Sequence, residues 1–134
     1  MSNESIFQGL DHLAIVVPDT DAALKVWRDR MGFPVVCSEA VNNNTVLLTH
    51  LDLGNTHLQL VQPLVDDHPL QAWLREHGSG LHHFCLKVAN VDNALTDAPV
   101  PAAAPTPHQG TQGKRALFLD KSHTDQVVVE VTGR

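Results

Sequence analysis

The sequence predicts an α+β domain made of two halves with the same order of elements. In each half an apolar strand is followed by a helix and then by further strands. One offset of 71 residues relates the halves, because it places His12 on His83 (83 minus 12) and Gln59 on Glu130 (130 minus 59). A chain of 134 residues suits one compact domain. We therefore expect a single domain over residues 1–134, with module one at about 8–64 and module two at about 80–134.

Module one is predicted to start with a strand and a helix. The apolar run LDHLAIVV ends at Pro18, which indicates a buried strand. Asp19 and Thr20 are residues that cap helices, and the following AALKVWRDRM predicts a helix that ends at Gly32. Three strands separated by turns at Asn42–Asn44 and Gly54-Asn55 are then expected: PVVCSEAV, TVLLTHLDL and HLQLVQP.

Module two follows a short amphipathic helix, HPLQAWLREHG. HHFCLKV predicts its first strand, and NVDNALTD predicts a helix that ends before Pro99. The Pro/Ala-rich PVPAAAPTPHQGTQG favours a loop with at most a short strand. KRALFLD and QVVVEVT predict the last two strands.

Composition excludes several classes of function. The net charge is −6 and no Lys/Arg cluster is present, so a nucleic-acid surface is not expected. No apolar run is long enough to span a bilayer, and the N-terminal residues do not resemble a secretory signal, so we expect a cytoplasmic protein that does not bind membranes. Cys37 and Cys85 lie in apolar strands and are predicted to be reduced core residues.

The repeat selects four polar residues: His12, Gln59, His83 and Glu130. Gln59 interrupts LQLV and Glu130 interrupts VVVEV, and polar groups buried in such strands need partners. Each half thus offers one imidazole and one oxygen donor. Two nitrogens and two oxygens suit a divalent metal ion such as Co, Mn, Ni or Zn.

The doublet His82-His83 contains one of these ligands. Successive side chains of a strand point to opposite faces, so the two imidazoles are not expected to share a site. The repeat pairs His83 with His12. We therefore predict His83 as the ligand and His82 as a structural neighbour.

Five stretches carry a family resemblance: LDHLAIVVPD, LGNTHLQLVQPL, GLHHFCLKV, GKRALFLDKS and VVVEV. They resemble the vicinal oxygen chelate (glyoxalase/bleomycin resistance/dioxygenase) superfamily and, within it, are most similar to the methylmalonyl-CoA epimerases. The likeness runs from Leu10 to Val131. It implies two βαββ modules that form an incomplete barrel around a metal site, often in a homodimer. The family's metal ligands fall by position on the same four residues that the repeat selects.

The resemblance implies a metal-dependent epimerase of methylmalonyl-CoA or a related 2-substituted acyl-CoA. Such an enzyme removes the proton next to the thioester and returns it from the opposite face, through a metal-stabilised enolate. Glu130 and His50 are the predicted proton-transfer groups, and Glu39 is a further candidate. Lys114 and Arg115 match the family's GKR stretch, and we expect them to contact anionic groups of the acyl-CoA substrate.

Two features depart from the family pattern. Leu48 stands where some epimerases carry a glutamate proposed as a base, and His50 shares its strand face. The Pro/Ala tract from Pro99 to Pro107 interrupts a helix that the family continues. Two alternatives therefore stay open: a glyoxalase-type lyase or isomerase, whose sites often carry glutamate in place of Gln59, and a small-molecule-binding member without catalysis. A ring-cleaving dioxygenase is disfavoured, because Gln59 adds a ligand to its two histidines and one carboxylate.

Overall fold

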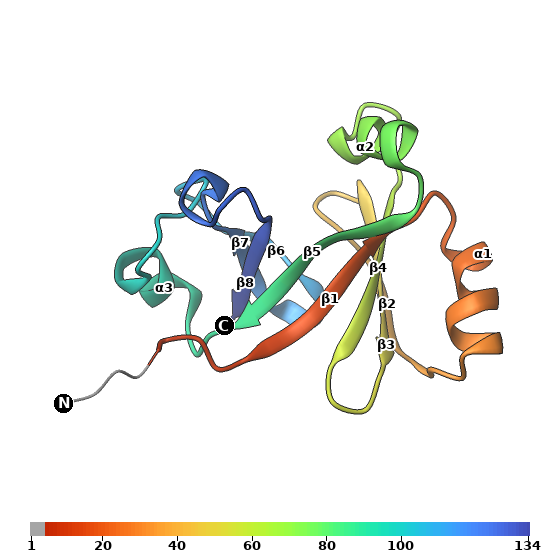
Figure 1. Ribbon diagram of the computed structural model, residues 1–134, viewed down its shortest axis with the longest axis horizontal. Helices are drawn as coiled ribbons and strands as arrows, with labels where there is room; N and C mark the ends of the chain where they lie inside the picture. The colour runs from red at the N-terminus through yellow and green to blue at the C-terminus, as the bar shows by residue number, and fades with distance from the viewer. Residues whose placement is uncertain (1–4) are drawn as a thin grey trace. The chain divides into compact units, whose positions relative to one another are not determined.

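The computed structural model describes residues 5–134, which divide into two compact units (Figure 1). Unit A comprises His12–His82, and unit B comprises the described residues up to Asp11 together with His83–Arg134. Within residues 5–134, no helix has the length and apolar character needed to cross a bilayer.

Unit A contains four strands in the order β2-β3-β4-β1. β1 runs parallel to β4, whereas β2 with β3 and β3 with β4 are antiparallel pairs. Its elements are β1 (Leu10–Val16), α1 (Thr20–Leu24), η1 (Lys25–Arg30), β2 (Val35–Val41), β3 (Val46–Asp52), β4 (His57–Pro63) and α2 (Pro69–His77).

The first predicted helix is confirmed, with a change of pitch along its length. Asp19 caps α1, because its side chain accepts a hydrogen bond from the backbone N–H of Asp21 at 3.1 Å. The chain then widens into the π-helical turn η1, in which the N–H of Met31 donates to the carbonyl of Val26, five residues earlier, at 2.9 Å. Gly32 ends the helix with a φ of 86°, a value that glycine adopts without strain.

Strand alternation divides the apolar side chains of unit A between two clusters. The first cluster includes residues of α1 and η1, and helix α2 packs against the second cluster. The buried members of the first cluster are Ile15, Val17, Leu24, Leu51, Leu58 and Leu60. The buried members of the second cluster are Ala14, Val16, Val41, Val46, Leu48 and Val61.

Strand β2 stands at the end of the strand order and is irregular. Its pairing with β3 shifts between Val35 and Cys37, which marks a β-bulge. Val35 and Val36 are 40% and 45% exposed there. The predicted turn after β2 is confirmed, and Asn42, Asn43 and Asn44 all have positive φ, a conformation that asparagine tolerates better than most residues.

Unit B contains four strands in the order β5-β8-β7-β6. β5 runs parallel to β8, and the other pairs are antiparallel. Each unit therefore has three strands after its first helix, as the sequence patterns predict for module one, and the βαββ order implied by the resemblance counts one strand fewer. The described elements are β5 (Gly80–Lys87), α3 (Val91–Asp97), β6 (His108–Gln109), η2 (Thr111–Gly113), β7 (Arg115–Phe118), η3 (Lys121–His123) and β8 (Val129–Gly133).

The Pro/Ala tract lies along β7. Helix α3 ends at Asp97, before Pro99, as predicted. Ala103 donates a backbone hydrogen bond to Phe118 at 2.8 Å, and Ala102 forms a β-bridge with Leu119. The segment therefore satisfies its backbone groups on a neighbouring strand instead of continuing the helix.

Leu60→Ala tests the first apolar cluster, because the Leu60 side chain is fully buried. We expect the free energy of unfolding to fall by about 2–5 kcal/mol, since the surroundings close only partly over the cavity. Urea denaturation followed by circular dichroism measures this loss. Leu81→Ala is the control, because Leu81 is 67% exposed, and it should change stability by less than about 0.5 kcal/mol. Equal losses in the two variants would contradict the packing described.

Candidate metal centre

Two of the four predicted ligands lie on one face of the sheet in unit A. In the parallel pairing of β1 with β4, His12 is opposite His57 and Ala14 is opposite Gln59, so His12 and Gln59 share a face. His12 is 4% exposed and Gln59 is 5% exposed. A buried imidazole and a buried amide thus interrupt a face whose neighbouring positions, Ala14 and Val61, are apolar.

His50 extends this polar group from β3. It is the cross-strand partner of Gln59, and it is 5% exposed. The amide nitrogen of Gln59 lies 3.1 Å from Nε2 of His50, and Nδ1 of His50 lies 3.2 Å from Nδ1 of His57. Both ring nitrogens of His50 therefore have a polar partner. The ring of His12 also contacts the ring of His50, with centroids 5.2 Å apart.

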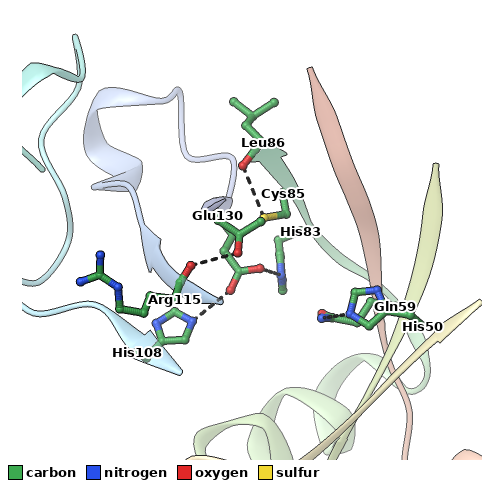
Figure 2. A network of polar contacts seen from close by, with 9 residues as sticks. His50, Gln59, His83, Cys85, Leu86, His108, Arg115 and Glu130 are labelled. Carbon is green, nitrogen blue, oxygen red and sulfur yellow. Dashed lines mark hydrogen bonds and ion pairs between the residues drawn. The ribbon is translucent and has the colours of Figure 1, made fainter. Parts of the chain in front are cut away.

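The other two predicted ligands contact each other in unit B. Nε2 of His83 lies 3.2 Å from Oε1 of Glu130, and both side chains are less than a tenth exposed. The second carboxylate oxygen, Oε2, lies 3.0 Å from Nε2 of His108. Figure 2 shows the Glu130 carboxylate with one oxygen toward each ring. The register of β5 and β8 pairs Cys85 with Glu130 and so sets the Glu130 side chain on this face.

The geometry of His83 and Glu130 fits a divalent cation. Two donor atoms bound at right angles, each about 2.1 Å from an ion, are about 3.0 Å apart. The separation between His83 Nε2 and Glu130 Oε1 is close to this value. Imidazole nitrogen and carboxylate oxygen are donors that Zn, Mn, Co and Ni all accept. In unit A, His12 offers a second imidazole and Gln59 offers a neutral amide oxygen.

His82 and His83 make different contacts. The ring of His82 packs edge-on against Trp73 of α2, with centroids 5.2 Å apart. The ring of His83 contacts Phe118 and the carboxylate of Glu130. The contact of His82 with Trp73 is a packing contact, which is consistent with the structural role predicted for His82.

Lys114 and Arg115 both lie beside carboxylates. Arg115 forms a two-pronged ion pair with Asp92 of α3 at 2.9 and 3.0 Å, and it also donates to the carbonyl of Arg134. This hydrogen bonding holds the pKa of Asp92 below its usual value. Lys114 is 46% exposed and its Nζ lies 3.8 Å from Asp11. Lys114 is therefore the more accessible cation of the two, because the guanidinium of Arg115 is already occupied.

Cys85 lies beside the Glu130 carboxylate and is fully buried. Burial raises the pKa of its thiol strongly, and the negative charge of Glu130 raises it further. The thiol therefore stays protonated at neutral pH. Both cysteines are free thiols, as predicted, but Cys37 is only partly buried and is therefore not the core residue that was expected.

Sequence reasoning gave no role to His108, which lies in the Pro/Ala-rich segment expected to form a loop with at most a short strand. The structure places it on β6, with its ring stacked on Phe118 and its Nε2 on Glu130. β6 has only two residues and lies among Pro, Ala and Gly, so periodicity gives no signal there. The 71-residue offset does give one, because it places His108 on Cys37, the cross-strand neighbour of His50.

The chain belongs to the Glyoxalase/Bleomycin resistance protein/Dioxygenase superfamily, whose sequence pattern matches residues 11–118. This match confirms the family predicted from the five sequence stretches. The chain also has the α+β fold of that superfamily, as its similarity to solved structures shows.

Several similar proteins are named methylmalonyl-CoA epimerases. The chain is 30% identical over 126 residues to mitochondrial methylmalonyl-CoA epimerase of Mus musculus, covering 91% of this chain and 71% of the relative. It resembles the crystal structure of methylmalonyl-CoA epimerase from Mycobacterium tuberculosis with a TM-score of 0.85 and 25% identity, covering 99% and 92% of the two chains. It resembles a Streptomyces coelicolor methylmalonyl-CoA epimerase variant in complex with 2-nitronate-propionyl-CoA with a TM-score of 0.81 and 29% identity, covering 95% and 97%.

The difference between the two cysteines gives a labelling prediction. In the folded protein at pH 8, a thiol reagent should modify Cys37 first and leave Cys85 unmodified, because burial keeps Cys85 protonated and out of reach. Mass spectrometry of peptides after timed labelling measures the two rates, and unfolding in guanidinium should make them similar. Rapid labelling of Cys85 in a folded Cys37→Ser variant would contradict its burial.

Proposed function

We propose that the protein is a metal-dependent epimerase of methylmalonyl-CoA or a related 2-substituted acyl-CoA. The observation that carries the proposal is the paired donors: each unit holds one imidazole and one oxygen side chain on a buried sheet face. The chain that holds them is 30% identical to a protein named methylmalonyl-CoA epimerase. A related structure contains an acyl-CoA analogue, which supports an acyl-CoA as the substrate class.

We propose His12, Gln59, His83 and Glu130 as the ligands of one divalent cation. When bound, the cation would supply the positive charge that stabilises the negative charge developing on the thioester oxygen. The side chains themselves contribute orientation. His83 and Glu130 already hold their donor atoms at a spacing that suits an ion.

Inversion requires two proton-transfer groups on opposite sides of the reacting carbon. Glu130 is one candidate, and the polar face of unit A supplies the others. Leu48 packs in an apolar cluster and has no group that can transfer a proton, but Glu39 is its cross-strand partner on β2 and is only partly buried. His50 lies two residues from Leu48 on the same face. We therefore propose that either His50 or Glu39 is the second group.

The anionic tail of an acyl-CoA needs a cation, and Lys114 is the better placed of the two predicted residues. Its ammonium is partly exposed and pairs with Asp11 only at 3.8 Å. The guanidinium of Arg115 is held in the ion pair with Asp92. We propose that Lys114 contacts the substrate phosphates and that Arg115 fixes α3 to the end of the chain.

Proton exchange in D₂O tests the reaction itself. The protein loaded in turn with Co, Mn, Ni or Zn is incubated with (2R)- or (2S)-methylmalonyl-CoA, and deuterium at the carbon between carboxylate and thioester is followed by NMR. The proposal predicts exchange with at least one metal and none after chelation. Absence of exchange with every metal would contradict it. Tight binding of the acyl-CoA without exchange would then favour the non-catalytic binding member.

His83→Ala should weaken binding of the divalent metal by more than about 100-fold, the upper figure for residues that only support a ligand. Isothermal titration calorimetry with the metal alone measures this change. His82→Ala is the matched control, because its ring packs on Trp73, and it should bind metal as the parent does. Unchanged affinity in a folded His83→Ala variant would remove His83 from the ligand set.

Glu39→Gln and His50→Gln distinguish the two candidates for the second proton-transfer group. The variant that lacks this group should lose exchange from one epimer by about 10²–10⁴-fold and keep exchange from the other, because each epimer is deprotonated by a different group. The D₂O experiment with each pure epimer reads this asymmetry directly. If both variants exchange both epimers at the parent's rate, neither residue transfers the proton.

A further inference from the structure

We propose that His50 and His108, two histidines outside the ligand set, are positioning residues for the two oxygen donors. His50 fixes the amide of Gln59, and His108 fixes the carboxylate of Glu130. The inference rests on the metal ligands of the proposed function. In each donor side chain the histidine contacts one polar atom, and this contact orients the other polar atom toward a cation.

The orientation of Gln59 decides whether it can bind a metal at all. An amide offers one oxygen with lone pairs and one nitrogen that only donates hydrogen bonds. The nitrogen lies 3.1 Å from Nε2 of His50, so it donates to the ring and leaves the oxygen for a cation. The reversed amide would place its oxygen against His50 and present N–H groups to the ion, which cannot coordinate it.

His57 fixes the form of His50 that this contact needs. To accept from Gln59, Nε2 of His50 must carry no proton, so the proton of the neutral ring is on Nδ1. Nδ1 lies 3.2 Å from Nδ1 of His57, which accepts this proton in a hydrogen bond. The hydrogen bonds thus run in one direction, from Gln59 to His50 and from His50 to His57. The register of β3 and β4 brings these side chains together, because it pairs His50 with Gln59.

His108 performs the same task on Glu130 through the second oxygen. A carboxylate that binds a cation through one oxygen leaves the other in need of a donor, and Nε2 of His108 supplies it at 3.0 Å. Oε1, which lies 3.2 Å from Nε2 of His83, is then the oxygen on the side of the other proposed ligand of unit B. The ring of His108 is held by stacking on Phe118, with centroids 5.3 Å apart and planes inclined by 22°. Phe118 is in turn the cross-strand partner of Glu130.

The two histidines share one principle. Each one contacts one polar atom of the donor side chain, the amide nitrogen of Gln59 or Oε2 of Glu130, and so orients the other polar atom. Each histidine comes from a different strand than the donor that it contacts. This assigns His50 a role through Gln59, with its Nε2 lone pair occupied, and makes Glu39 the remaining proposed proton-transfer residue of that face.

Affinity for the metal alone tests the proposal. His50→Leu and His108→Leu remove the hydrogen bonds, and each should weaken binding of Zn²⁺ and Co²⁺ by about 10–100-fold. His50→Gln and His108→Gln can restore an acceptor for Gln59 and a donor for Glu130, and each should bind within about threefold of the parent. His123→Leu, whose ring is more than half exposed, is the control for loss of an imidazole. The visible spectrum of bound Co²⁺ should change in His108→Leu, because the freed carboxylate oxygen can join the coordination.

NMR of the metal-free protein provides a readout that does not depend on metal binding. Long-range ¹H–¹⁵N correlations of the imidazole rings report which nitrogen is protonated. We expect the proton of His50 on Nδ1 and a proton of His108 on Nε2. A proton on Nε2 of His50 would overturn the assigned orientation of Gln59.

The outcomes separate this inference from the proposed function. If the parent binds metal and the folded leucine variants bind it equally tightly, the positioning role is wrong and the epimerase proposal stands. Weak binding in the leucine variants with recovery in the glutamine variants supports the positioning role. A parent that binds none of the divalent metals overturns both.

Discussion

A carboxylate that lies among buried valines needs hydrogen-bond donors, and this need shapes unit B. Glu130 is 7% exposed and lies between Val129 and Val131, which belong to the apolar core. An unpaired charge there would cost several kcal/mol. Two imidazoles supply the contacts: His83 from β5 and His108 from the two-residue strand β6. The two-residue strand β6 thus positions a hydrogen-bond donor, the His108 ring, at the second oxygen of the Glu130 carboxylate.

Unit A also buries a polar side chain, Gln59, among apolar residues. Gln59 is neutral, so its burial costs less than that of a carboxylate, and one histidine partner is seen on its nitrogen. The face that holds it is divided along its length. His12, His50 and Gln59 form a polar end, and Leu48 with Val46 and Val61 forms an apolar end against α2. A leucine at position 48 strengthens that apolar end at the expense of an acidic group on β3.

The sequence predicted most of the architecture because the signals were local. Strand alternation, the cap at Asp19 and the helix stop before Pro99 each depend on a few neighbouring residues, and each is confirmed. The repeat chose one histidine and one oxygen donor per half, and it did so without knowledge of side-chain contacts. The widening of the first helix into η1 gave no such signal, since it depends on where the Val26 carbonyl meets the Met31 N–H.

Contacts between side chains were harder to predict than elements. The partners of His50 follow from the register of β3 and β4, and a shift of one residue would turn its ring to the opposite face. His108 depends on a strand too short to show periodicity. The ion pair of Arg115 with Asp92 was not predicted, because it depends on how α3 packs beside β7.

The bulge in β2 also affects how copies of the chain behave at high concentration. A regular strand at the end of a strand order offers a straight row of backbone donors and acceptors, to which another strand can add. In β2 the register shift between Val35 and Cys37 interrupts this row where two exposed valines would otherwise favour such pairing. Deleting Val36 would remove the bulge and give β2 regular pairing with β3. The regular edge would then be more prone to aggregation.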